Sequence, residues 1–300
     1  AWSAGIRFYD TAPWYDHGLS EHRIGGLLRQ QNPEEFICST KVGRVYSRFR
    51  GKAKDFYGPP WAGGLPFTLR FDYTYDGILR SYEDSLLRLG LNRVDVLIIH
   101  DIDLNYHRTE SHINQRFREL ESGWKALDEL KRTGEIQAFG AGINKEALIP
   151  RFLEECPLDF FLVAHPYTLL DQGVLDTIFP KCERLGVGVV VGAPYASGIL
   201  ATGAVQGAKY RYSEATPDVM AKVQLIERLC KDHQIPLKAA ALQFPLGHPL
   251  VASIIPGAFR PEQVTENRKL FEHPIESSFW DACKTANLIR MDAPVPSHDF

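Results

Sequence analysis

The chain has 300 residues, a formal net charge of -3 and 44% hydrophobic residues. This composition is typical of a globular protein with a large core, and the near-neutral charge gives no reason to expect a nucleic acid or an anionic membrane as a partner. No apolar run reaches the roughly 18 residues that a transmembrane helix needs, and the first residues lack the basic and apolar segments of a secretory leader.

Short apolar runs alternate with longer amphipathic stretches along the chain. The apolar runs predict strands at 5–10, 35–42, 94–101, 136–143, 160–166, 186–194 and 251–257. Helical spacing predicts helices at 20–31, 75–90, 116–134, 145–155, 173–186, 216–234, 237–247 and 261–272. Ser20 would cap the first of these helices, and Gly90 would end the second.

The predicted strands are continuous apolar runs, as expected for a parallel sheet that is covered on both faces. A doubly wound sheet is the alternative, but seven regular strand–helix units favour an α/β fold, a (β/α)8 TIM barrel formed by one domain over residues 1–300. The first βα unit would be largely missing. The segment "AWSAG" is typical of a helix end, so we expect a strand and most of a helix, about 25–30 residues, before Ala1.

Two stretches show no regular period. Residues 43–74 are rich in Gly, Pro, Arg and aromatic residues, and loops of this length are usually functional lids or disordered. Because this stretch follows a strand, it would lie on the face where a barrel has its active site. Residues 199–213, rich in Gly, Ala and Tyr, form a second such loop.

Polar side chains stand at the ends of three successive predicted strands: Asp10 with Tyr15 just beyond it, then Lys41, then His100. Neighbouring strand ends lie within about 5–10 Å of each other, and a barrel takes its catalytic groups from there. Each residue alone has an ordinary explanation, such as a turn cap, a solvated strand end or a core histidine. Together, on three adjacent strands, they favour a catalytic site.

This set of side chains suits proton transfer coupled to hydride transfer. A tyrosine hydroxyl has an ordinary pKa near 10, too high for a base at neutral pH, and an adjacent ammonium lowers it by about 1–3 units. We therefore expect Lys41 to lower the pKa of Tyr15, Asp10 to keep Lys41 charged and oriented, and His100 to hold the substrate oxygen.

Three segments, "DTAPWYDHGLSE" (10–21), "STK" (39–41) and "LIIHD" (97–101), resemble the motifs of the aldo-keto reductase family in order and spacing. The resemblance covers essentially the whole chain. It implies an NAD(P)-dependent oxidoreductase on a (β/α)8 barrel. It also implies that Tyr15 is the proton donor or acceptor, with Lys41 and Asp10 as its tuning pair and His100 as the substrate orienter.

Later segments resemble the cofactor-binding parts of this family. By that resemblance, Asn144 in "GAGIN" would hold the nicotinamide carboxamide, and His165 in "VAHPY" would assist it. Gly192, followed by Pro194 in "VGAPYASG", stands where members of the family stack an aromatic ring on the nicotinamide. Either that stacking is lost here or Tyr195 supplies it.

The segment "IPGAFRPEQVTEN" (255–267) resembles the family's adenosine-phosphate segment. Members that prefer NADP carry Lys and Arg where this chain has Gly257 and Gln263. NAD is therefore favoured over NADP, with Arg260 as the one cation that could pair with a second phosphate. Asn267 would contact the adenine edge.

Residues 71–101 and "GAPYASGIL" (192–200) resemble the branch of the family that oxidises cyclic hemiacetals to lactones. Its substrates are aldoses, such as L-fucose, L-galactose or D-threo-aldoses, oxidised at C1, and pyridoxal. A polar pocket would suit the sugar and a flat aromatic slot would suit pyridoxal, with Trp14, Trp61 and Tyr46 as the expected walls. We expect the sugar.

Two other functions remain as alternatives. One is a cofactor-binding regulatory barrel with little turnover, which the intact set of four residues disfavours. The other is reduction of aldehydes by NADPH, which the absent phosphate-binding cations disfavour. The oligomeric state is left open.

The cysteines and two neighbouring histidines give no metal-binding pattern. The five cysteines are scattered, odd in number and without a C-x-x-C pair, so we expect no disulfides, no zinc site and a cytoplasmic protein. They are Cys38, Cys156, Cys182, Cys230 and Cys283. His17 and His22 are expected to be exposed to solvent rather than to bind a metal.

Overall fold

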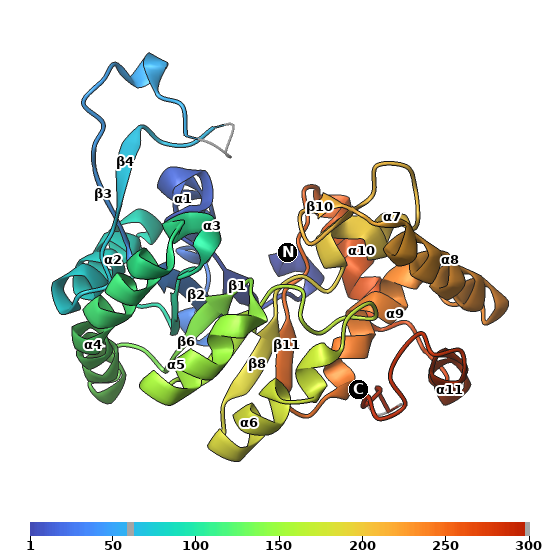
Figure 1. Ribbon diagram of the computed structural model, residues 1–300. Helices are drawn as coiled ribbons and strands as arrows, with labels where there is room; N and C mark the ends of the chain where they lie inside the picture. The colour runs from blue at the N-terminus through green and yellow to red at the C-terminus, as the bar shows by residue number, and fades with distance from the viewer. Residues whose placement is uncertain (59–62, 298–300) are drawn as a thin grey trace.

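Seven parallel strands form one curled sheet in the computed structural model, which describes residues 1–58 and 63–297 (Figure 1). In spatial order they are β1 (Phe8–Asp10), β2 (Ile37–Val42), β5 (Val96–Ile99), β6 (Ala138–Ile143), β7 (Phe160–Val163), β8 (Gly188–Val191) and β11 (Val251–Ile254). The spatial order follows the chain order, and each neighbouring pair is parallel. The seven predicted strands are therefore confirmed, and the observed strands are shorter because the polar residues at their ends belong to loops.

The eight predicted helical segments are present, with shifted ends. They are α1 (Leu19–Leu28), α2 (Tyr75–Leu89), α4 (Glu110–Arg132), α5 (Ile149–Glu155), α6 (Ile178–Leu185), α8 (Pro217–Asp232), α9 (Leu237–Gln243) and α10 (Pro261–Phe271). The prediction missed α3 (Leu104–His107), α7 (Ile199–Thr202) and α11 (Ser277–Thr285). None of the described helices is long and apolar enough to cross a membrane.

Helix α1 begins differently from the prediction. Its N-cap is Gly18, with φ of 94°, and Ser20 lies inside the first turn, where its hydroxyl is 3.0 Å from that of Thr11. The turn before it has positive φ at Asp16 and His17 as well, so the chain needs a residue without a side chain to enter the helix. Gly90 does end α2, as predicted, with φ of 63°.

The two edge strands of the sheet are β1 and β11. A cavity of about 370 Å³ lies along both, lined by apolar side chains that include Phe8, Ile254 and Phe271. A closed barrel of this type has eight strands. The sheet therefore has the (β/α)8 architecture with one strand position between β1 and β11 that no described residue fills.

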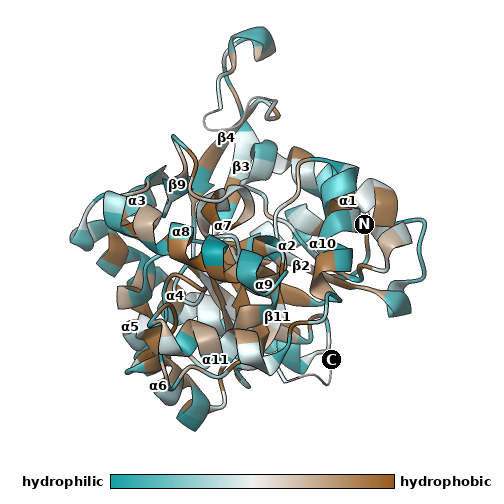
Figure 2. Cartoon of the chain, turned by 90° about the vertical axis from the view of Figure 1, so that its right-hand side faces the viewer, coloured by the Kyte–Doolittle hydropathy of each residue, from teal (hydrophilic) through white to brown (hydrophobic). Residues whose placement is uncertain are grey.

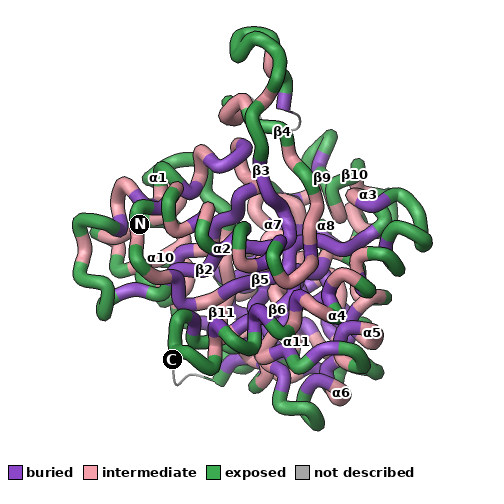
Figure 3. Tube along the Cα trace, turned by 90° about the vertical axis from the view of Figure 1, so that its left-hand side faces the viewer, coloured by how far each residue is buried: buried purple, intermediate pink, exposed green. Residues whose placement is uncertain are grey.

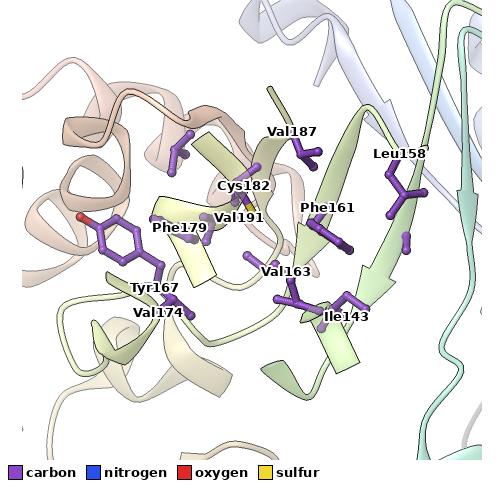
Figure 4. Packing of buried hydrophobic residues seen from close by; sticks show 14 of the residues in the cluster. Ile143, Leu158, Phe161, Val163, Tyr167, Val174, Phe179, Cys182, Val187 and Val191 are labelled. Atoms are coloured by element: carbon purple, nitrogen blue, oxygen red, sulfur yellow. The ribbon is translucent and has the colours of Figure 1, made fainter. Parts of the chain in front are cut away.

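The core lies between the strands and the helices that cover their outer face. Figure 3 shows the strands as mostly buried segments inside more exposed helices. Around α6, Phe161 and Val163 of β7 and Val191 of β8 point to the same cluster as Phe179 and Cys182 (Figure 4). Such apolar burial stabilises the fold by about 25 cal/mol per Å² removed from water.

All five cysteines are buried and unpaired. Burial raises the pKa of Cys38, Cys230 and Cys283 to about 12 and that of Cys182 to about 11. Thiols in this condition hold very little of the reactive thiolate.

The stretch 43–74 is not the structureless loop that its composition suggests. Strands β3 (Arg44–Arg48) and β4 (Phe67–Phe71) pair antiparallel, with Arg44 opposite Phe71, and form a ribbon that projects from the body (Figures 1 and 2). The alternating pattern of "RVYSR" and "FTLRF" accounts for the pairing. Within residues 199–213, β9 (Lys209–Tyr210) and β10 (Ser213–Glu214) form a smaller hairpin.

Candidate active site

A cavity of about 510 Å³ opens at the carboxyl ends of the parallel strands. Its lining includes all four predicted catalytic residues: Asp10, Tyr15, Lys41 and His100. The cavity has the size of an ordinary small-molecule site. Strand register explains the convergence, because Asp10 of β1 is paired with Ser39 of β2, and Lys41 of β2 is paired with Ile98 of β5, two residues before His100.

Lys41 and Asp10 form a buried ion pair, with Nζ of Lys41 2.6 Å from Oδ2 of Asp10. The ammonium also donates to the carbonyl oxygen of Thr11 at 2.9 Å, and Ser39 donates its hydroxyl to Oδ1 of Asp10 at 2.6 Å. Burial lowers the pKa of Lys41, but Asp10 and Tyr15 raise it by more, so the net direction is upward. Lys41 is therefore charged and held in place, as the sequence analysis predicted for this pair.

Tyr15 lies against Lys41, with Nζ 4.8 Å from the centre of the phenol ring. Burial raises the pKa of Tyr15, and Lys41 lowers it by less, so the pKa stands above its ordinary value. The predicted direction of the Lys41 effect is correct, but the expectation of a net lowered pKa is wrong for the protein alone. The desolvation of the phenolate, which the sequence analysis did not weigh, is the larger effect.

His100 turns toward its own neighbour in the chain. Its Nε2 lies 3.1 Å from Oδ2 of Asp101, and its ring meets that of Tyr15 edge-on, with centroids 5.9 Å apart. Burial and the nearby Arg44 lower the pKa of His100 to about 3, so the imidazole is neutral at working pH. Since the carboxylate accepts a hydrogen bond from Nε2, the single ring proton lies on that nitrogen.

Asp101 has two further partners, Arg44 and Asn144. Arg44, at the base of the ribbon, places Nη2 3.3 Å from Oδ2, and Asn144 donates its amide to Oδ1 at 2.8 Å. Burial raises the pKa of Asp101, but His100 and Arg44 lower it by more, and the carboxyl is ionised. The guanidinium of Arg44 is almost fully buried and lies over the rings of Trp14 and Tyr106, 4.9 and 4.4 Å from their centres.

Hydrogen bonds from other parts of the chain hold the loop that carries Tyr15. Glu21, fully buried at the start of α1, accepts hydrogen bonds from the Thr40 hydroxyl at 2.7 Å and from Nε of Arg88 at 2.5 Å. Tyr46 donates its hydroxyl to the carbonyl oxygen of Pro13 at 2.8 Å. These contacts tie the two ends of the loop to β2, α2 and β3.

The three expected walls of the substrate pocket have different places. Trp14 lines the cavity and meets Tyr106 edge-on at 6.2 Å. Tyr46 lies beneath the loop through its bond to Pro13 and does not appear among the described lining residues. Trp61 lies outside the described residues.

His17 is buried, contrary to the expectation of an exposed side chain. Its Nδ1 lies 3.3 Å from the carbonyl oxygen of Phe67, and its ring packs beside those of Trp14, Tyr46 and Phe56. The ribbon, which composition did not predict, covers it. His22 is exposed. No group of three potential metal ligands is found in the described part of the chain.

Two of the four residues expected to hold nicotinamide line the cavity, and the other two follow lining residues in the chain. Asn144 and Gly192 line it, and Pro194 is buried just beyond β8. His165, 3% exposed and with φ of 83°, has two ring nitrogens that are buried without a hydrogen-bond partner among residues 1–58 and 63–297. Burial lowers the pKa of His165 to about 4, which leaves a neutral ring. Unsatisfied buried nitrogens of this kind are rare in folded proteins and fit a carboxamide partner.

The residues expected near the adenosine and its phosphates lie around the start of α10. Gly257 lines the cavity, and Arg260 is exposed. Gln263 accepts the backbone N–H groups of Phe259 and Arg260, at 2.7 and 3.2 Å, and so caps the helix. Asn267 accepts a hydrogen bond from the hydroxyl of Tyr195 at 2.6 Å and lines the second cavity, between β1 and β11.

Several lining residues escaped the sequence analysis: Asp101, Asn105, Tyr106 and Tyr212. The signal for Asp101 and its neighbours was present, because the polar run "HDIDLNYH" directly follows a strand. Tyr212 lies in the stretch 199–213 that was predicted as a second irregular loop, but no pattern in that stretch distinguished this residue. It comes from the hairpin far along the chain, and only the fold brings it to the cavity.

The chain matches the Aldo/keto reductase family over residues 1–288. It is 39% identical over 297 residues to a pyridoxal 4-dehydrogenase of Microbacterium luteolum, and 35% identical over 292 residues to a D-threo-aldose 1-dehydrogenase of a Pseudomonas species. Each alignment covers 96% of this chain and 86% of the relative.

The fold resembles that of an aldo-keto reductase from Bacillus halodurans in its holo form, with a TM-score of 0.70 at 23% identity. That match covers 99% of this chain and 86% of the other. The chain therefore belongs to the aldo-keto reductase family, whose members are oxidoreductases that use nicotinamide cofactors.

Proposed function

We propose that the protein oxidises a cyclic hemiacetal to a lactone, with NAD as the hydride acceptor. The observation that carries the proposal is the buried Asp10–Lys41 pair set against Tyr15 in the lining of the cavity. In the reaction the hemiacetal carbon gives up a hydride, its hydroxyl gives up a proton, and the carbonyl group of the lactone forms between the same two atoms.

Tyr15 is the group that takes the proton. Its hydroxyl lines the cavity beside the only charged amine there among the described residues, that of Lys41. When bound, the oxidised nicotinamide supplies the hydride acceptor and a positive charge, which adds to that of Lys41 in lowering the pKa of Tyr15. Asp10 keeps Lys41 oriented, and the Ser39 hydroxyl orients Asp10 in turn.

The lining of the cavity favours pyridoxal as the hemiacetal. Trp14 and Tyr106 supply aromatic surface, which suits a flat pyridine ring. Asp101 and Asn144, which could otherwise bind sugar hydroxyls, are hydrogen-bonded to each other. The 39% identity to a pyridoxal 4-dehydrogenase points the same way.

An aldose oxidised at C1 is the second candidate, although the sequence analysis placed it first. The Asn105 side chain on the cavity wall offers a partner for a hydroxyl. The 35% identity to a D-threo-aldose 1-dehydrogenase supports this candidate.

NAD is the proposed cofactor because the start of α10 offers few groups for a second phosphate. Gly257 has no side chain, and the carboxamide of Gln263 is engaged with two backbone N–H groups. Asn144, His165 and Gly192 would hold the nicotinamide end.

The test offers NAD with pyridoxal, L-fucose or L-galactose and follows the formation of NADH and of the lactone. We expect turnover with pyridoxal, and replacement of Tyr15 by Phe should reduce it by about 10²–10⁴-fold while NADH still binds. The Tyr57→Phe variant, altered at an exposed tyrosine of the ribbon, is the matched control. Binding of NADH without oxidation of any hemiacetal would favour a regulatory barrel instead, and an active Tyr15→Phe variant would remove Tyr15 from the reaction.

A further inference from the structure

The cavity lining has no side chain at Gly192. This residue follows β8 directly and lines the cavity, where it offers backbone but no ring. Tyr195 was the alternative source of a ring in the sequence analysis. Its hydroxyl is bound to Asn267 at 2.6 Å, and it is not among the described lining residues of the catalytic cavity. An aromatic contact for a flat ligand in this part of the cavity would therefore have to come from a residue other than 192 or 195.

Tyr212 is the aromatic side chain that reaches the cavity from the hairpin β9–β10. It stands in the same lining as Gly192, Asn144 and Tyr15. Its ring meets that of His165 edge-on, with centroids 4.7 Å apart. Tyr212 therefore lines the cavity, and its ring packs against the buried His165, which is not among the described lining residues.

The turn of the hairpin has an unusual backbone conformation at Arg211 and Tyr212, and this conformation sets the direction of the Tyr212 ring. Arg211 and Tyr212 have φ of 48° and 65°, a conformation in which glycine or asparagine is usual and which is unfavourable for other residues. Strain of this kind persists only where surrounding contacts impose it, and it is concentrated at functional sites.

Contacts on both sides of the turn impose this conformation. Arg211 pairs with Asp171, on the loop after β7, and lies 3.5 Å from Glu146. The backbone N–H of Tyr212 donates to the hydroxyl of Ser197 at 3.0 Å. The hairpin is thus fastened over the strand ends with the side chain of Tyr212 directed to the cavity.

We propose that Tyr212 supplies the aromatic face against which the nicotinamide ring lies, in place of the ring that is absent at Gly192. This inference rests on the proposed cofactor-dependent function. The nicotinamide carbon that accepts the hydride must lie near Tyr15, and its carboxamide near Asn144 and His165. Gly192 and Tyr212 line the same cavity as Tyr15 and Asn144, so a ring held there would have Tyr212 as an aromatic neighbour.

The experiment measures the dissociation constant of NADH in the absence of substrate, from the change in nicotinamide fluorescence. Loss of a stacked aromatic contact should weaken binding about 3- to 10-fold in Tyr212→Ala, whereas Tyr212→Phe should bind like the wild type. Tyr57→Ala removes a similarly exposed tyrosine from the ribbon and serves as the control.

A second readout follows the hairpin itself. Trypsin can cut after Lys209 in β9 and after Arg211 in the turn. Bound NADH should slow that cleavage in the wild type and in Tyr212→Phe, and should slow it less in Tyr212→Ala at equal saturation.

Two outcomes would overturn the inference. If Tyr212→Ala binds NADH as tightly as the wild type and changes only the KM for the hemiacetal, then Tyr212 faces the substrate. If the wild type binds neither NADH nor NADPH, the proposed function itself fails. This outcome differs from the first one, in which the cofactor binds but Tyr212 does not contact it.

Discussion

Nε2 of His100 lies 3.1 Å from Oδ2 of Asp101, the next residue in the chain, and the same oxygen lies 3.3 Å from Nη2 of Arg44. The arrangement makes Asp101 the common partner of a neutral imidazole and a buried guanidinium. Asp101 reaches both groups because its backbone has a positive φ of 39° just after β5 ends. Asp101, which is not one of the four predicted catalytic residues, therefore orients the ring of His100.

The neutral state of His100 should make the protein less stable in mild acid. Burial and Arg44 lower the pKa of His100 to about 3, whereas an unfolded histidine titrates near 6.5. Between these values the unfolded chain binds more protons, so stability falls as pH drops from about 6.5 toward 3. At pH 5 this amounts to about 2 kcal/mol.

Urea unfolding at pH 7.5 and pH 5 measures this effect. His100→Gln should lose about 2 kcal/mol less than the wild type between the two values, and His22→Gln, altered at an exposed histidine, should behave as the wild type. Equal losses in all three proteins would show that His100 is not held neutral.

Replacing Lys41 by Met should move the rise of the oxidation rate with pH, which follows deprotonation of Tyr15, to higher pH by about 1–3 units. The reason is that Lys41 opposes the effect of burial on the pKa of Tyr15. The measurement is the pH profile of kcat/KM from pH 6 to 10.5. Since this change leaves Asp10 buried without its cation, the Asp10→Asn/Lys41→Met double variant should show the same shift. An unmoved rise in an active variant would contradict this role of Lys41.

The double variant Gly257→Lys/Gln263→Arg should raise the ratio of kcat/KM for NADP to that for NAD by about tenfold or more, equal to about 1.4 kcal/mol. It adds two cations and frees the backbone N–H groups that Gln263 now caps. Loss of the cap should cost about 1 kcal/mol of stability. Gln30→Arg, on an exposed site after α1, controls for added charge, and an unchanged ratio would place the phosphate site elsewhere.

Replacing Glu21 by Gln should destabilise the protein by about 3–5 kcal/mol, because it leaves Arg88 without its buried partner. Urea unfolding of Glu21→Gln, and of the Glu21→Leu/Arg88→Leu pair, gives the comparison. The double variant should lose less than the single one, since no charge is left unpaired. A larger loss in the double variant would show that shape rather than charge fixes this contact.

The architecture and the central site were predictable because they depend on local patterns. Asp10, Lys41 and His100 each stand directly at the end of an apolar run, and parallel register brings such ends together. The ribbon was missed because "RVYSR" and "FTLRF" are separated by 18 residues without a period, so their alternation was hidden by composition.

Contacts between distant segments were not predictable from pattern. Arg44 at the start of β3 forms an ion pair with Asp101 after β5. Tyr212 contacts His165 from a hairpin 47 residues further along the chain. The net pKa of Tyr15 also depends on how deeply the phenol is buried, which spacing does not reveal. Such effects follow from packing and desolvation, which the fold alone determines.

The burial of every cysteine has a practical consequence. With their pKa raised to about 11 or above, these thiols hold roughly a hundredth or less of the thiolate of an exposed cysteine at pH 7.5, and reagents cannot reach them readily. A cysteine introduced at Val205, which is half-exposed on the segment leading to the hairpin, would be the one that a maleimide dye labels quickly. The natural sequence is thus ready for single-site spectroscopic labelling without removal of any native residue.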